Sequence, residues 1–152
     1  MNRLLAALSL ALLSSCAALN GQNPHESKQI LDRSEVAQVA KVKHILIAWS
    51  WLGGAYRRMG LPLDPRAEGR NEKGADELAE QLLQRCTKGE PFEALMKEYS
   101  EDEGSAQTGL TYTVSDETKM VEPFKDLSRR LKPGECGLVR SQFGWHVIKR
   151  FA

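Results

Sequence analysis

The chain has 152 residues, 41% of them hydrophobic and 27% charged, which suits one globular domain and excludes a wholly disordered protein. Lysine and arginine (21) nearly balance aspartate and glutamate (20), so the formal net charge is +1. This balance provides no overall basic field for nucleic acid, and we expect no nucleic-acid partner.

The first fifteen residues have the pattern of an export signal peptide. Met-Asn-Arg gives a cationic start, and residues 4–13 form an apolar run that is followed by small residues. The run is shorter than the roughly 20 residues that a permanent membrane-spanning helix needs. Residues 13–16 (Leu-Ser-Ser-Cys) resemble the lipobox of bacterial lipoproteins, which implies that Cys16 becomes lipidated and N-terminal. The alternative is an ordinary signal peptide cut near Ala17, with Cys16 incidental.

Residues 16–41 are interpreted as the lipidated cysteine and a linker. Residues 17–27 have the composition of a flexible tether. Residues 28–41 are either linker or a loosely docked helix, because their apolar positions form a poor stripe. His25 therefore falls outside the expected domain, which spans residues 42–152.

This domain is expected to contain four strands and three helices. The β-branched run over residues 42–49 predicts a strand buried on both faces, and residues 50–70 predict a long loop. Apolar residues at helical spacing predict a helix over 74–85 and a second helix that begins at Pro91. A polar turn at residues 100–105 follows, and the order strand, helix, strand, strand then completes an α+β domain. These last elements are expected at residues 110–114, 124–131, 137–140 and 145–151, with a hairpin connection at 141–144.

Two cysteines remain beside Cys16. An oxidising compartment would permit a bridge between Cys86 and Cys136, but their separation in sequence does not fix the distance between them. We expect two unlinked, partly buried thiols. The residues around neither of them match a cysteine protease.

Five blocks of the chain recur, in the same order, in parvulin-type peptidyl-prolyl isomerases. They are Lys43–Ile47, Pro91–Leu95 with Tyr99–Asp102, Met120–Phe124, Leu131–Glu135 and Phe143–Lys149. The resemblance covers about residues 42–152 and implies a four-stranded antiparallel sheet surrounded by helices. The chain departs from the family at residues 108–111, which read Thr-Gly-Leu-Thr in place of the usual Gly-Asp-Leu-Gly.

The resemblance implies four catalytic residues. His44 and His146 match the family's paired histidines, which lie on adjacent central strands in a hydrogen-bond network beneath the substrate. Ser141 matches a hydroxyl position of that network, and Asp102 matches an acid that faces the reacting carbonyl. Considered without the family, each histidine fits a satisfied buried side chain better than a catalytic one, and Asp102 is also consistent with a solvated turn residue.

It also implies an apolar pocket for the proline ring. Met120 and Phe124 match pocket residues, and their four-residue spacing places both on one helix face. Leu110 and Phe143 are expected as further walls. The spacing of Met120 and Phe124 alone would favour core residues, and it is the matching block around them that favours the pocket.

The predicted loop at residues 50–70 carries four arginines, and three large aromatic side chains lie in it or directly before it. Basic residues at this place bind phosphate in some relatives, but we expect a solvated loop here, because an exported protein seldom meets phosphorylated clients. The aromatic residues are expected to extend the apolar binding surface. The arginines are Arg57, Arg58, Arg66 and Arg70, and the aromatic residues are Trp49, Trp51 and Tyr56.

The sequence therefore predicts an isomerase that rotates X-Pro bonds of exported proteins and assists their folding, with proline-containing unfolded polypeptides as partners. No cofactor is expected, and the three scattered histidines predict no metal site. A non-catalytic chaperone-like module that binds unfolded chains in the same groove is the alternative, and a purely structural lipoprotein is a third possibility. The expected location is the cell envelope, anchored by lipid and facing the periplasm. An aspartate directly after the lipidated cysteine often retains a lipoprotein at the inner membrane. This chain has Ala17 at that position, which favours the outer membrane.

Overall fold

The computed structural model describes residues 23–152, so the expected signal peptide and Cys16 lie outside the described residues. Four strands form one antiparallel sheet in the order β2-β1-β4-β3. This arrangement confirms the predicted α+β class with a four-stranded sheet. The strands are β1 (Ala40–Ile47), β2 (Tyr112–Val114), β3 (Cys136–Ser141) and β4 (Gly144–Arg150). The longer helices are α4 (Glu72–Thr87), α5 (Phe92–Tyr99) and α7 (Glu122–Arg130).

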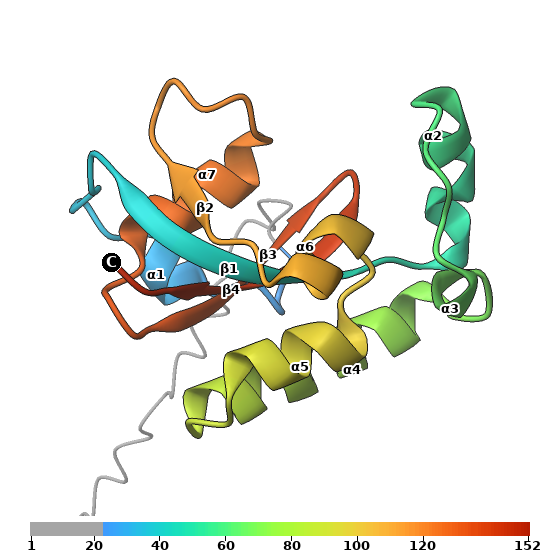
Figure 1. Cartoon of the computed structure of the whole chain (residues 1–152), viewed down its shortest axis with the longest axis horizontal. Helices are drawn as coiled ribbons and strands as arrows, with labels where there is room; N and C mark the ends of the chain where they lie inside the picture. Colours follow the sequence, from blue (N-terminus) through green and yellow to red (C-terminus); the bar gives the residue numbers. More distant parts are fainter. Residues whose placement is uncertain (1–22) are drawn as a thin grey trace, which may run out of the picture.

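The sheet is covered on both faces (Figure 1). On one side α4 and α5 pack over Ile45, Ile47 and Trp145, all of which are fully buried or nearly so. On the other side α7 packs over Val42 and Ile148. Because successive residues of a strand point to opposite faces, the central strands must be apolar on both, as their sequences are.

The register of the central pair places both predicted histidines on the α7 face. His44 pairs with Ile148, and Leu46 pairs with His146. The two histidines are therefore diagonal neighbours on one face of adjacent strands, within reach of each other.

Residues expected as linker pack onto the domain. Helix α1 (Lys28–Leu31) buries Ile30 in the α7 core. Ser27 exchanges two hydrogen bonds of 2.8 Å with the main chain of Leu138, through its backbone N–H and its Oγ. The Glu26 carboxylate accepts from the backbone N–H of Arg140 at 3.0 Å. These contacts cover the outer edge of β3, so the folded unit includes residues before position 42.

Short helices occupy two segments that were expected as loop or turn. The 50–70 segment contains η1 (Ser50–Leu52), α2 (Gly53–Arg58) and α3 (Pro65–Glu68), and α6 (Glu103–Thr108) follows α5. A helix of six residues or fewer makes less than two turns and shows no full apolar stripe, so the spacing of apolar residues could not indicate it. The expectation that Trp49 extends the binding surface was wrong, because this side chain is buried in the core with residues of α4 and α5.

Cys86 and Cys136 form a disulfide, with their Cα atoms 6.3 Å apart, which corrects the expectation of two free thiols. The bridge joins the end of α4 to the start of β3. Their pairing follows from the packing of α4 against the sheet, which the sequence separation of 50 residues could not reveal. The cross-link closes a segment that contains α5, α6, β2 and α7.

Gly144 begins β4 directly after the hairpin turn and has a φ of +130°. A Cβ at this position would overlap the carbonyl oxygen of Ile47 and would lie 3.0 Å from the Cα of Ala48. Glycine is thus required both by its backbone conformation and by the close approach of β1. Across residues 23–152, no helix has the length and apolar character needed to cross a bilayer.

Candidate active site

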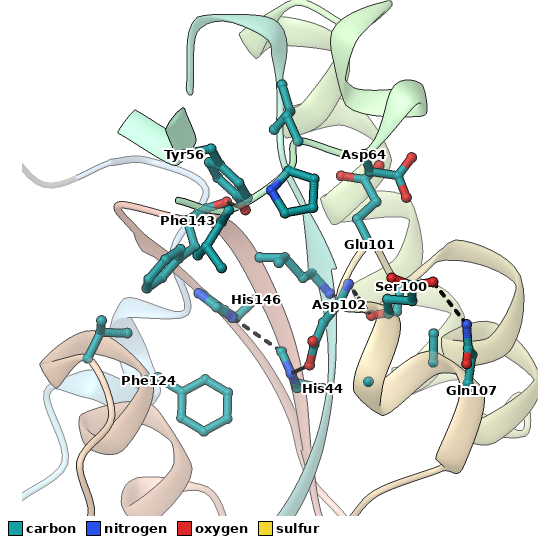
Figure 2. Close-up of a pocket in the computed structure, with 18 of the residues that line it drawn as sticks. His44, Tyr56, Asp64, Ser100, Glu101, Asp102, Gln107, Phe124, Phe143 and His146 are labelled. Atoms are coloured by element: carbon teal, nitrogen blue, oxygen red, sulfur yellow. Dashed lines mark hydrogen bonds and ion pairs between the residues drawn. The ribbon is translucent and has the colours of Figure 1, made fainter. Parts of the chain in front are cut away.

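A pocket of about 1090 Å³ opens on the α7 side of the sheet. Its base is formed by His44 of β1 and His146 of β4. Its walls come from five other parts of the chain: α7 with the turn before it, residues 56–66, residues 97–107, Tyr112 of β2, and the hairpin residues 142–143. Figure 2 shows Tyr56 and Phe143 above the histidine pair and Phe124 below it.

The two histidines connect a continuous chain of hydrogen bonds. Their Nδ1 atoms are 3.3 Å apart, so one imidazole donates to the other. His146 Nε2 is 2.7 Å from Ser141 Oγ, and His44 Nε2 is 3.0 Å from Asp102 Oδ2. Tyr112 donates its hydroxyl to the same Asp102 oxygen at 3.0 Å. One arrangement satisfies every group: Ser141 donates to His146, His146 to His44, and His44 to Asp102, with both imidazoles neutral.

The electrostatics of the site agree with this arrangement. Burial, with a smaller contribution from His44, lowers the pKa of His146 to about 3, so this imidazole is neutral at pH 7. The hydrogen bond from His44 holds the pKa of Asp102 well below its usual value, although burial opposes this. Burial and the Asp102 charge raise the pKa of Tyr112 to about 12 and keep its hydroxyl a donor. The Asp102 carboxylate is therefore a fixed negative charge at the base of the pocket, close to the neutral His146 ring.

The apolar walls include three of the four predicted residues. Phe124 is buried and meets both imidazoles edge to face, with ring centroids 5.2 Å from His44 and 5.4 Å from His146. Met120 and Phe143 also line the pocket. The Phe143 carbonyl accepts from the Tyr56 hydroxyl at 2.8 Å, which fixes the hairpin over the histidines.

Leu110 is not part of the pocket. Its side chain is 47% exposed and precedes the strand. Tyr112, two residues later, forms the wall instead, with its ring centroid 5.4 Å from His44 and 6.2 Å from Phe124. The sequence pattern did not single out Tyr112, because residues 110 and 112 of a strand point to the same face. The structure distinguishes them, since β2 begins at Tyr112 and Leu110 lies before it.

Comparison with known proteins identifies the family. Residues 27–152 match the family model described as the PPIC-type PPIase domain. The chain belongs to this family. The resemblance to peptidyl-prolyl isomerases that the sequence predicted is thus confirmed.

Relatives of this PPIase domain include two folding factors. Chaperone SurA of Chromohalobacter salexigens is 43% identical over 81 residues, which are 53% of this chain and 19% of the relative. Foldase protein PrsA 4 of Bacillus cereus is 40% identical over 81 residues, 53% of this chain and 28% of the relative. The chain thus spans less than a third of the length of either relative.

Solved structures show the same fold. PrsA from Bacillus subtilis has a TM-score of 0.51 and 29% identity, and the match covers 76% of this chain and 35% of that one. The peptidyl-prolyl isomerase ESS1 from Candida albicans has a TM-score of 0.60 and 21% identity, with 76% and 63% covered.

Two arginines of the 50–70 segment serve the PPIase fold itself. Arg66 donates to the Asp64 carboxylate at 2.7 Å and to the Ser100 carbonyl at 2.9 Å. Arg70 donates to Glu101 at 2.6 Å. Both guanidinium groups have carboxylate partners within the protein. The Arg70 side chain is 17% exposed, whereas that of Arg66 is 47% exposed and lines the pocket. Within the described part of the chain, no three histidine, cysteine, aspartate or glutamate side chains converge as metal ligands would.

Proposed function

We propose that this PPIase domain catalyses X-Pro bond rotation in exported polypeptides and assists their folding. The observation that carries the proposal is a largely apolar pocket whose base holds a continuous chain of hydrogen bonds from Ser141 to Asp102. The pocket volume, about 1090 Å³, is large enough for a few residues of an extended chain. The family assignment and the names of the folding relatives support the same function.

The chemistry requires the barrier to amide rotation to be lowered. This barrier is about 18–20 kcal/mol, because resonance gives the C–N bond partial double-bond character. Water stabilises the planar, charge-separated form, and this form is lost when the bond twists. A dry pocket therefore raises the planar ground state relative to the twisted state, and about 5 kcal/mol would give nearly four decades in rate.

The residues have distinct proposed roles. Met120, Phe124 and Tyr112 hold the proline ring and exclude water. The Asp102 carboxylate faces the carbonyl oxygen, whose negative charge is greatest in the planar amide, so their repulsion favours the twisted state. His44 and His146 hold Asp102 in place through their hydrogen bonds and do not exchange protons with the substrate.

The test is the cis-to-trans rate of a proline peptide. Wild type should accelerate it. Met120→Ala should lose at least about tenfold in kcat/KM because the proline ring loses its contact surface, and His44→Ala should lose a similar factor because Asp102 loses its partner. Circular dichroism of each variant verifies that it is folded.

A non-catalytic chaperone-like module is the second candidate. The similarity to SurA, a chaperone, favours it. A well-folded wild type that binds unfolded polypeptide but leaves the isomerisation rate unchanged would support this candidate against the isomerase. A protein that did neither would fit a structural lipoprotein.

We also propose that residues 1–15 are a lipoprotein signal peptide and that Cys16 is lipidated, which places the domain on a cell-envelope membrane, facing the periplasm. The small residues before Cys16 support this, and Ala17 supports the outer membrane. Labelling cells with a radioactive fatty acid tests it. Wild type should carry the label and sediment with membranes, whereas Cys16→Ser should do neither. Equal label on both proteins would contradict the proposal.

A further inference from the structure

The edge of β1 beyond β2 is closed by two residues of the segment after α5, Ser100 and Glu101, through three hydrogen bonds. Strand β2 pairs only with residues 40–42 of β1. Farther along, the backbone N–H of Leu46 donates to Ser100 Oγ at 3.2 Å, and the backbone N–H of Glu101 donates to the Leu46 carbonyl at 2.9 Å. The Glu101 carboxylate then accepts from the backbone N–H of Ala48 at 2.6 Å. This segment therefore takes the place of a partner strand.

Arg70 holds the Glu101 carboxylate from the opposite side. Its Nη1 donates to Glu101 Oε1 at 2.6 Å and to the Ala48 carbonyl at 2.8 Å. The Glu101 side chain is only 2% exposed and that of Arg70 17%. Burial raises the pKa of Glu101, although the Ala48 N–H and Arg70 oppose it. A carboxylate this buried keeps its place only while its cation partner remains, because an unpaired buried charge is costly.

Asp102 follows Glu101 directly. A single peptide group therefore joins the anchored Glu101 to the residue whose carboxylate contacts His44. That carboxylate has His44 Nε2 and the Tyr112 hydroxyl at 3.0 Å each. The main-chain oxygen of Asp102 accepts from Ser105 at 3.2 Å, at the start of α6. Asp102 is thus fixed from α6 and β2 on one side and from Glu101 on the other.

We propose that Arg70 and Glu101 are positioning residues that set the place of the Asp102 carboxylate against His44. This proposal rests on the proposed isomerase function. Neither residue touches the bond that rotates. They act through the Glu101–Asp102 peptide, and a displacement of about 1 Å at a reacting group is enough to cost up to about a hundredfold in rate.

The experiment uses Arg70→Gln in the full chain, with Arg85→Gln as a matched control. Arg85 also pairs with a glutamate, Glu90, at 2.5 Å, but both side chains are more than a third exposed and outside the pocket. We expect Arg70→Gln to lower kcat about tenfold while KM stays within about twofold, because the walls that bind proline are unchanged. Arg85→Gln should match wild type. Arg70→Lys, which keeps the positive charge on a side chain that is one bond shorter, should fall between the two.

The ¹⁵N signals of the His44 ring provide a readout that general destabilisation would not move. Arg70→Gln should shift them in the folded protein, and Arg85→Gln should not. A folded Arg70→Gln variant with wild-type kcat, or with a lowered kcat and unchanged His44 signals, would overturn the positioning role. If Arg70→Gln does not fold, wild-type kcat and signals in Arg70→Lys would overturn it in the same way. A wild type without isomerase activity would refute the proposed function, while the His44 signals would still decide the positioning.

Discussion

The Nδ1 atoms of His44 and His146 face each other at 3.3 Å across the two central strands. The register makes this contact possible, since His146 pairs with Leu46, two residues from His44 on the same face. Two imidazoles at this distance can share one hydrogen bond only if at least one of the facing nitrogens lacks a proton. Burial lowers the pKa of His146 to about 3, so the two imidazoles are not both charged at neutral pH and a hydrogen bond between them is possible.

The first prediction is an acid sensitivity that comes from His146. Burial lowers its pKa to about 3 in the folded state, while an unfolded histidine titrates near pH 6.5. Between these values the unfolded chain binds one more proton, so the free energy of unfolding must fall as the pH falls below about 6.5. The slope should approach about 1.4 kcal/mol per pH unit. Urea unfolding between pH 4.5 and 5.5 measures it, roughly where an ordinary histidine is already protonated.

His146→Gln is the comparison for this measurement. Its slope should be smaller by the contribution of one proton, whatever its absolute stability. His25 does not interfere, because its hydrogen bond with Glu80 raises its pKa and it is protonated in both states in this pH range. Equal slopes in wild type and His146→Gln would show that His146 does not remain neutral in the folded protein.

The second prediction separates Tyr112 from Leu110. Tyr112→Phe removes the hydroxyl that donates to Asp102 and keeps the ring, so it should cost about 1 kcal/mol of stability and several-fold in kcat/KM. Tyr112→Ala should lose more activity because the wall itself is removed. Leu110→Ala should stay within about twofold of wild type, since this side chain is outside the pocket. The assignment of the wall fails if Leu110→Ala is the more impaired variant.

The third prediction concerns the Cys86–Cys136 disulfide. It closes a loop of about 50 residues, for which the chain-entropy model gives a stabilisation of about 4 kcal/mol. Reduction should therefore lower the urea midpoint of the wild-type protein markedly. The double variant Cys86→Ala/Cys136→Ala should show the lower midpoint with or without reductant. A wild-type midpoint that does not respond to reductant would contradict the bridge.

The fourth prediction compares two glycines. Gly144→Ala combines a strained φ of +130° with an overlap on the Ile47 carbonyl, and we expect a loss of about 3 kcal/mol or more. Gly60 also has a positive φ, +70°, but a Cβ there meets nothing within 4 Å. Gly60→Ala should therefore cost only the backbone strain, about 1–2 kcal/mol. Similar losses in both variants, measured by thermal unfolding, would show that the close approach of β1 and the hairpin contributes little.

The long elements of this fold could be predicted because their residue spacing carries the signal. The apolar run of β1 and the stripes of α4, α5 and α7 span enough residues to distinguish a strand from a helix. Helices α2, α3 and α6 do not, and they form because neighbouring segments supply their contacts and caps, as Asp64 does for α3. The disulfide was missed for a related reason, since tertiary packing alone brings Cys86 to Cys136.

The candidate site was predicted from sequence blocks that recur in the family. The error at Leu110 falls in a segment whose sequence differs from the family pattern. His44, Asp102, Phe124 and His146 lie within blocks that match the family, and the structure brings them together around one pocket. Leu110 lies in the segment that departs from the family pattern, and there the structure uses Tyr112. Arg70 gave no signal as a partner of Glu101, because nothing in the sequence relates two residues that are 31 positions apart.

The contacts of Glu26 and Ser27 along β3 have a consequence for a protein whose proposed clients are unfolded chains. Such clients carry long stretches of unpaired backbone, and an open strand edge is a template for pairing with them and for aggregation. On β3, the outward N–H groups of Leu138 and Arg140 already have side-chain acceptors from Ser27 and Glu26. A client strand would have to displace these residues before it could extend the sheet, which leaves the pocket as the more accessible place for it to bind.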